Sequence, residues 1–306
     1  MKALYYPLDI EHIWKKRRSM KKQLLQQENL LEKRIAILSG STIGDIKNIL
    51  EIFLLKHGIK PIFYEGLYGR FYEEAVYDNE RLVEFKPDIV YIHTTNKNIE
   101  RFPDITATRE DVEALVTNEM NKFNMIWETL YEKCNCMIIQ NNFEPLKHRT
   151  SGNSECYRDN GSIRYINLLN EKFYEYARNH QAFFINDINY LSATVGLNIW
   201  YDDSMWYMYK YALSLKAIPE LCSNLSNIIK ALYGKNKKSL VLDLDNTLWG
   251  GVIGDDGIEG IQVGNDNAVS EAYMAFQNYI KQLKDRGVML NVCSKNDEVI
   301  ARDAFE

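Results

Sequence analysis

The sequence predicts an α/β fold made of two Rossmann-like three-layer domains, each with a parallel sheet. Short apolar runs of strand length alternate with longer helical segments along most of the chain. This alternation is typical of a parallel sheet covered by helices on both faces. One polar stretch, residues 234–238, interrupts the alternation and is typical of a linker. We therefore expect one domain over residues 1–234 and a second over residues 235–306.

The elements of the first domain follow from these patterns in chain order. A segment rich in Lys, Glu, Gln and Leu predicts a helix over residues 9–33. Asp45 is placed to cap a helix that Gly58 ends. The expected strands are 34–38, 61–64, 88–93, 136–140 and 182–185, and the expected helices are 46–57, 111–133 and 163–178, with further helices up to residue 233.

The second domain opens with the apolar run 239–242, which is too short for a helix and predicts a buried strand. A helix is expected over residues 270–286, where Gly287 supplies a favourable C-cap. A second strand over residues 288–293 and a short helix over residues 297–305 follow.

Composition narrows the class of protein. The 306 residues are 46% hydrophobic and 26% charged, with a net charge of -5, whereas nucleic-acid binders are usually basic. No apolar segment approaches the length of a membrane span, and no secretory signal is visible at the N-terminus. Cys134-x-Cys136 lacks a second cysteine pair, so a zinc site is not expected. Reduced thiols in a cytoplasmic protein fit this pattern, with neither nucleic acid nor membrane as a partner.

One charged segment stands out near the N-terminus. Lys15, Lys16, Arg17 and Arg18 are followed closely by Lys21 and Lys22. Such a cluster is either the solvated face of a helix or a contact surface for an acidic partner.

The chemistry-bearing motif follows the strand predicted over residues 239–242. That strand ends in Asp243 and Asp245, with Thr247 shortly after, and ligands of open α/β sheets bind at the carboxyl ends of strands. An aspartate can form a covalent phosphoryl intermediate while its neighbour carries a proton or helps to hold a metal. A solvated strand end is the simpler alternative. A calcium loop is excluded because Leu248 and Gly254 occupy the positions of its glycine and bidentate glutamate.

Two motifs carry a family resemblance. Asp-x-Asp-x-Thr after an apolar strand resembles the first motif of the haloacid dehalogenase (HAD) superfamily. The longer string DLDNTLWGGVIGDDGIEGI, residues 243–261, resembles the FkbH-like branch, subfamily IIIC. The second HAD motif is a strand that ends in Ser or Thr, and Ser294 occupies that place within the string SKND. The resemblance implies a phosphatase or phosphotransferase that uses Mg²⁺.

The same resemblance implies roles for the two aspartates. Asp243 would attack the phosphoryl group and form an aspartyl phosphate. Asp245 would protonate the leaving oxygen and then activate water. Mg²⁺ would be held by the Asp243 carboxylate and the Asp245 backbone carbonyl, because a phosphate dianion between two carboxylates needs a neutralising cation.

It also implies a phosphate-binding set. Ser294 Oγ and the Lys295 backbone N–H would hold phosphate oxygens at the start of a helix, while Asn246 and Thr247 fix the loop. Asp243 and Ser294 are 51 positions apart, which leaves no room for a large cap domain. We therefore expect an open site that accepts a phosphorylated small molecule or a substrate linked to a carrier protein.

Part of the HAD site lies outside this sequence. The superfamily also uses a lysine against the phosphate and an acidic pair that completes the metal shell, both beyond the helix that follows the second motif. The sequence stops at Glu306 inside that helix, so the second domain is expected to be incomplete at its C-terminus. If nothing followed Glu306, we would expect little turnover.

The first domain resembles a degenerate SGNH hydrolase domain, a type that occurs N-terminal to FkbH-like domains. Ser41 falls at the nucleophile position and Asn96 matches one residue of the third block. The last block, which normally supplies a histidine, has Met205 or Trp206 instead. A serine nucleophile needs an adjacent base, so we expect this domain to be non-catalytic.

Two other functions stay open. FkbH-like proteins are linked to glyceryl transfer from a phosphorylated glycerate to an acyl carrier protein, and Cys293 lies beside Ser294, although a buried structural Cys293 is the simpler interpretation. A non-catalytic interaction module is the other alternative. An aromatic cluster could line a carrier surface, but we interpret it as a helix packed on the core: Trp200, Tyr201, Trp206, Tyr207 and Tyr209.

Overall fold

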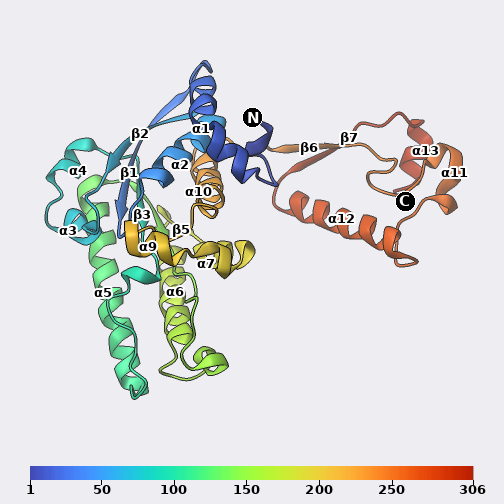
Figure 1. Cartoon of the computed structure of the whole chain (residues 1–306). Coiled ribbons are helices and arrows are strands. Elements are labelled where there is room, and N and C mark those ends of the chain that lie inside the picture. Colours follow the sequence, from blue (N-terminus) through green and yellow to red (C-terminus); the bar gives the residue numbers. More distant parts are fainter. Residues whose placement is uncertain (306) are drawn as a thin grey trace. The chain divides into compact units, whose positions relative to one another are not determined.

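The computed structural model describes residues 1–305, and the chain forms two compact units, residues 1–234 and 235–306 (Figure 1). The α/β fold class predicted from the sequence is confirmed. No helix among residues 1–305 is both long and apolar enough to cross a membrane.

The first unit is built on a five-stranded parallel sheet with the strand order β2-β1-β3-β4-β5. Because the order reverses between β1 and β3, the loops after these two strands border the crevice in which open α/β sheets bind ligands. The strands are β1 (Leu31–Ser39), β2 (Ile59–Glu65), β3 (Ile89–His93), β4 (Met137–Asn141) and β5 (Phe183–Asn186).

Alternating side chains divide the core of this unit into two layers. Ile35 and Ile37 of β1 pack into one cluster, and Ala36 and Leu38 into the other, because successive side chains of a strand point to opposite faces. The first face is covered by α1 (Ile10–Leu24), α2 (Gly44–Lys56), α7 (Ile188–Val195), α8 (Leu197–Trp200) and α10 (Ile218–Leu232). The second is covered by α3 (Phe71–Val76), α4 (Glu80–Phe85), α5 (Arg109–Cys134) and α6 (Ser162–Asn179).

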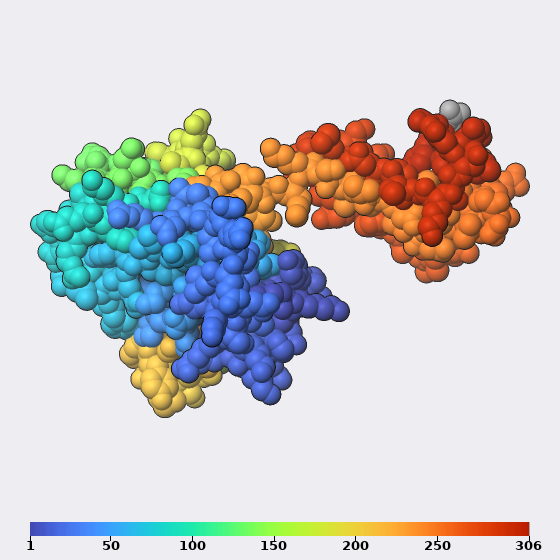
Figure 2. Space-filling view, turned by 90° about the horizontal axis from the view of Figure 1, so that it is seen from above, coloured from blue at the N-terminus to red at the C-terminus, as the bar shows by residue number. Residues whose placement is uncertain are grey.

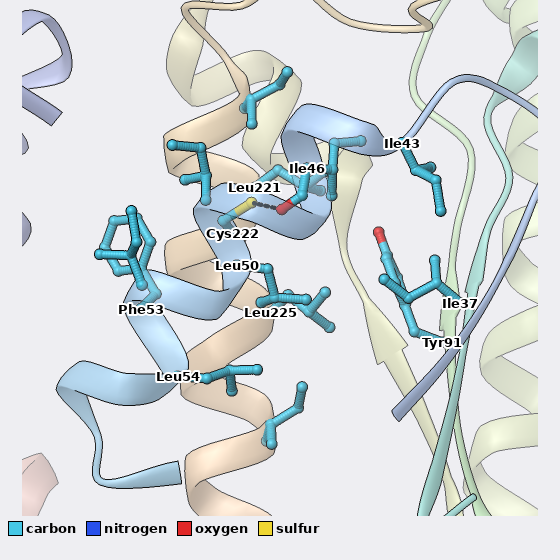
Figure 3. Packing of buried hydrophobic residues seen from close by; sticks show 14 of the residues in the cluster. Ile37, Ile43, Ile46, Leu50, Phe53, Leu54, Tyr91, Leu221, Cys222 and Leu225 are labelled. Atoms are coloured by element: carbon cyan, nitrogen blue, oxygen red, sulfur yellow. Dashed lines mark hydrogen bonds between the residues drawn. The ribbon is translucent and has the colours of Figure 1, made fainter. Parts of the chain in front are cut away.

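Helices α2 and α10 form the densest part of the first layer (Figure 3). Leu50 and Phe53 of α2 and Leu221 and Leu225 of α10 belong to one core cluster, and all four side chains are fully buried. Between the helices the Cys222 thiol donates to the Ile46 carbonyl at 3.4 Å. This contact holds α2, and with it the loop after β1, against the last helix of the unit.

Two details of the sequence-based prediction are wrong. The first helix ends at Leu24 instead of continuing to residue 33, because residues 31–39 pair with β2 and β3 as a central strand. Asp45 does not cap α2: Ile43 occupies the N-cap, and the Asp45 carboxylate accepts a hydrogen bond from the Tyr211 hydroxyl at 3.0 Å. A distant tertiary partner has replaced the local one in each case.

The second unit is smaller. Strands β6 (Ser239–Leu242) and β7 (Met289–Val292) pair in parallel, and α12 (Ala268–Asp285) connects them. Asn267 caps α12 by accepting from two backbone N–H groups, and Gly287 follows the helix at φ +88°, as a C-cap requires. Helices α11 (Ile253–Gly260) and α13 (Glu298–Asp303) complete the unit around a core that includes Leu242, Leu244, Leu248, Trp249, Ile253 and Ile280.

Candidate functional site

The predicted site lies at the carboxyl end of β6. Leu242 and Leu244 are buried, so the residue between them, Asp243, points to the exposed side. The pairing of Leu242 with Val292 brings the loops after β6 and β7 to the same edge. The Leu244 backbone N–H donates to Asp243 Oδ1 at 2.8 Å, while Oδ2 has no hydrogen-bond partner among residues 1–305. Asp243 therefore keeps one carboxylate oxygen available.

Asp245 is held quite differently. Trp249 Nε1 and the Ile253 N–H each donate to its Oδ1 at 3.1 Å, and Asn296 Nδ2 donates to its Oδ2 at 2.9 Å. Burial raises the pKa of this carboxyl, but the hydrogen bonds from Ile253, Asn296 and Trp249 outweigh it and lower the pKa below the usual value. Asp245 is thus an ionised, fixed carboxylate at neutral pH.

The loop after β6 closes on itself. Asn246 adopts a left-handed backbone at φ +52°, its Oδ1 accepts from the Gly251 N–H at 3.1 Å, and its own N–H donates to the Gly251 carbonyl at 3.3 Å. The Thr247 N–H donates to the Leu244 carbonyl at 3.1 Å. A Cβ at Gly250 would lie 2.9 Å from the Tyr273 ring, so glycine is required there. Asn246 and Thr247 therefore shape the loop, and the Asn246 side-chain oxygen is already engaged.

Ser294 and Lys295 follow β7. Ser294 Oγ accepts from the Asn296 N–H at 3.2 Å, which leaves its hydroxyl proton to donate. The Lys295 backbone N–H donates no hydrogen bond within the described part of the chain. Lys295 does not open a helix as predicted, because Asp297 is the N-cap of α13. Its N–H is available because it belongs to a turn.

The oxygens that could hold a cation are few. Asp243 Oδ2 and the Asp245 backbone carbonyl accept no hydrogen bond from residues 1–305, and two such hard oxygens suit Mg²⁺, which keeps several waters. The Asp245 carboxylate is occupied by its three donors. Within the described residues no cluster of three or more His, Cys, Asp and Glu side chains could form a metal cage. The described residues could therefore bind Mg²⁺ through two oxygens, Asp243 Oδ2 and the Asp245 carbonyl.

Cys293 and the aromatic cluster differ from their expected placement. Cys293 is exposed, so a buried structural role is wrong. Trp200 and Tyr201 are buried, but α9 (Asp203–Tyr209) buries none of its side chains, and Tyr207 and Tyr209 are exposed. The expectation holds only in part: Trp206 of α9 is half-buried and packs against the core, whereas Tyr207 and Tyr209 do not.

The first unit lacks the parts of a serine hydrolase site at the matching edge. Ser41 is buried, and its Oγ has no partner within residues 1–305. The buried His93 imidazole is occupied at Nδ1 by Tyr91 and Asn141, and burial lowers its pKa to about 4. Asn96 uses its amide to hold the Glu144 carbonyl and the Tyr201 hydroxyl. Within residues 1–305 no histidine is hydrogen-bonded to Ser41 Oγ, so this serine has no base in place.

Comparison with known proteins agrees with the motifs. A model of the FkbH N-terminal domain matches residues 56–230. The chain belongs to the FkbH family. The chain is similar to the N-terminal part of BF1531 from Bacteroides fragilis, with a TM-score of 0.82 and 26% identity over 94% of this chain and 76% of that one. That crystal structure is described as containing a phosphatase domain complexed with Mg.

Two more distant structures resemble the first unit of this FkbH protein less closely. One is the catalytic domain of the peptidoglycan O-acetyltransferase OatA from Streptococcus pneumoniae, at a TM-score of 0.36 and 11% identity over 67% of this chain and 96% of that one. The other is an acylhydrolase from Bacteroides fragilis, at 0.38 and 14% over 70% and 96%. No curated protein matches the chain.

Sequence reasoning missed the two side chains that hold Asp245 in this FkbH protein. Trp249 and Asn296 both stand inside the quoted motif strings, at residues 243–261 and 294–297. Trp249 reaches Asp245 within the loop after β6, and the parallel pairing of β6 and β7 brings Asn296 to the same carboxylate.

Substituting Asn296→Ala should raise the pKa of Asp245, because a hydrogen bond to the ionised form is lost. The measurement is a carboxyl-carbon NMR titration of aspartate-labelled protein. Asn291→Ala is the matched control, since the Asn291 amide donates to Ser239 Oγ on the same pair of strands. An unchanged Asp245 titration, or an equal shift in the control, would contradict this role.

Glu144 is the opposite case in the first unit. Its carboxyl is fully buried, Oε2 accepts only the Asn96 N–H at 3.2 Å, and Oε1 has no partner within residues 1–305. Burial raises its pKa from 4.5 to about 7. The folded state therefore keeps a proton that the unfolded chain releases above pH 4.5. Stability from this residue is complete at low pH and is lost as the pH rises to about 7.

Substituting Glu144→Gln should remove the loss of stability that Glu144 causes as the pH rises. The free energy of unfolding of the variant, relative to the wild type, should rise between pH 5 and pH 8 by up to roughly 3 kcal/mol. Denaturant unfolding at several pH values measures it, with the exposed Glu84→Gln as control. A difference that does not change with pH would show that Glu144 ionises normally.

Proposed function

We propose that this protein is a Mg²⁺-dependent phosphatase or phosphotransferase that acts through an aspartyl phosphate on Asp243. The observation that carries the proposal is the contrast between two carboxylates at one strand end. Asp243 is exposed with a free oxygen, and Asp245 is fixed and ionised by three donors. One group is free to react, and the other is built to stay in place.

The nucleophilic step uses Asp243. One of its carboxylate oxygens forms a bond to phosphorus while the bond to the leaving oxygen breaks. Water then cleaves the aspartyl phosphate, and inorganic phosphate leaves. When bound, Mg²⁺ would neutralise the charge between the phosphate and the carboxylates, held by the Asp243 carboxylate and the Asp245 carbonyl. The Ser294 hydroxyl and the Lys295 N–H supply donors that no other group uses.

The lowered pKa of Asp245 bears on the leaving group. An ionised Asp245 suits the second step, in which it accepts a proton from water. It suits the first step best when the leaving group departs without a proton, as the carboxylate of an acyl phosphate does. We therefore include acyl phosphates, and not only phosphate esters, among the proposed substrates.

The test is phosphate release from an aryl phosphate and from acetyl phosphate by the full-length protein in Mg²⁺. Asp243→Asn should lower the rate at least about a hundredfold, because the nucleophile is lost. Chelation of Mg²⁺ should do the same. Asp255→Asn, an exposed aspartate of the same unit, should not. Activity retained in Asp243→Asn would overturn the mechanism, and a wild type inactive on both compounds would favour a non-catalytic interaction module.

A second function is favoured by the exposure of Cys293 beside Ser294. In FkbH-type transfer, a thiolate would attack the acyl carbon of a glycerate that is phosphorylated on its carboxyl group. The bond between that carbon and the phosphate oxygen would break, and phosphate would leave. The glyceryl group would then pass to the thiol of an acyl carrier protein, and the first thiolate would be released. Acyl and phosphoryl chemistry would then share one open edge of the second unit.

Cys293→Ser separates the two functions. If Cys293 carries the acyl group, this variant should lose glyceryl loading of the carrier protein, followed by mass spectrometry, and keep phosphate release from aryl phosphate. Cys156→Ser, the other exposed cysteine, is the control and should keep both activities. Loading that survives in Cys293→Ser would assign the attack to another thiol.

A further inference from the structure

Helix α1 presents a concentrated basic face. Six of the 37 Lys and Arg residues of the chain lie between Lys15 and Lys22. The apolar side of α1 packs against the core, where Ile13, Met20 and Leu24 are buried. The cations are therefore directed outward, and only Lys21 forms an ion pair, with Glu51 at 2.6 Å.

Arg17 divides two hollows along this helix. Its guanidinium lies 5.6 Å from the centre of the Trp14 ring and donates to the Trp14 carbonyl, and Trp14 Nε1 donates to the Leu215 carbonyl at 2.9 Å. The basic hollow, about 230 Å³, is lined by Arg17, Arg18, Lys21, Asp45, Asn48 and Ile52. The apolar hollow, about 490 Å³, is lined by Ile10, Glu11, Trp14, Lys15, Arg17, Leu215 and Lys216.

Helix α9 carries exposed side chains, and Tyr211, which follows it, is bonded to a residue of the basic hollow. On α9, Tyr207 is 74%, Met208 63% and Tyr209 57% exposed. The Thr42 hydroxyl donates to the Tyr209 carbonyl at 2.6 Å, and Tyr211 donates to Asp45 of the basic hollow at 3.0 Å. In Figure 2 the segment that includes α9, in gold, and N-terminal residues, in blue, are both visible at the surface of the first unit. We call α1, α9 and the two hollows the basic–aromatic surface.

The chemistry of this surface selects the partner. Arg, Trp, Tyr and Met are the residue types enriched at protein–protein interfaces, and large exposed apolar side chains mark contact sites. A nucleic-acid backbone or an anionic membrane surface presents mainly negative charge, and Glu11 and Asp45 inside the hollows would oppose it. A protein can match both signs of charge and fill the apolar hollow as well.

We propose that the basic–aromatic surface docks an acidic carrier protein, whose carboxylates meet α1 and whose apolar side chain enters the hollow at Trp14 and Leu215. The charge complementarity rests on the residues of α1. The choice of a carrier protein rests on the transfer function proposed above, whereas the surface itself does not depend on phosphatase chemistry.

The test is binding of a purified holo acyl carrier protein to the full-length protein, measured by calorimetry at low and moderate salt. Lys15→Glu/Arg18→Glu reverses two exposed cations that make no ion pair within residues 1–305 and should weaken binding at least tenfold. Tyr207→Ala should weaken binding without changing its salt dependence. Lys133→Glu/Arg158→Glu makes the same charge change at exposed positions of α5 and of the segment before α6, and should leave binding unchanged.

Three results would overturn the proposal. One is the absence of binding by the wild type, and another is an equal loss in the Lys133→Glu/Arg158→Glu control. The third is binding of another partner at this surface. That would be binding to phosphatidylserine vesicles, or self-association seen by light scattering, that disappears in Lys15→Glu/Arg18→Glu. Lys15→Glu/Arg18→Glu should keep wild-type phosphate release from aryl phosphate, so failure of docking is distinguishable from failure of the proposed phosphatase.

Discussion

Parallel strand pairing is the constraint on which both units depend. It requires every strand to end at the same edge, so polar residues that are far apart in the sequence meet there. In the second unit this brings Asp245 and Asn296 within hydrogen-bond distance across β6 and β7. In the first unit it brings Asn96 after β3 to Glu144 after β4. The chemistry of each edge is then decided by how many donors the loops supply.

Asp245 and Glu144 illustrate that dependence. Both carboxyls are withdrawn from water at a sheet edge, and burial alone favours the neutral form of each. Asp245 receives three hydrogen bonds and is ionised, whereas Glu144 receives one and keeps its proton close to neutral pH. Glu144 is also the more deeply buried of the two, so burial and the number of donors together separate the ionised carboxylate from the protonated one.

The sequence predicted the parts that rest on local patterns. Apolar runs located all seven strands in order, and the motif strings identified the FkbH family through residues 243–261 and 294–297. Features set by tertiary contact were missed. The short helices α3 and α4 gave no separate signal. Asp45 looked like a cap but bonds Tyr211, and Asn296 looked like a loop residue but holds Asp245. The aromatic cluster near α9 was expected to pack on the core, and the sequence could not show that Tyr207 and Tyr209 stay exposed.

The carboxyl edge of the sheet in the first unit holds a serine and an asparagine whose partners differ from those expected of a serine hydrolase site. Ser41 has no hydrogen-bonded base within residues 1–305, and the Asn96 amide donates to the Glu144 carbonyl in the loop after β4. Large apolar side chains that stay exposed mark contact sites on a protein surface. Tyr207 and Tyr209 stay exposed beside a helix whose cations have few partners. The docking proposed for the first unit therefore draws on its surface, whereas the phosphoryl chemistry proposed for the second unit draws on its strand ends.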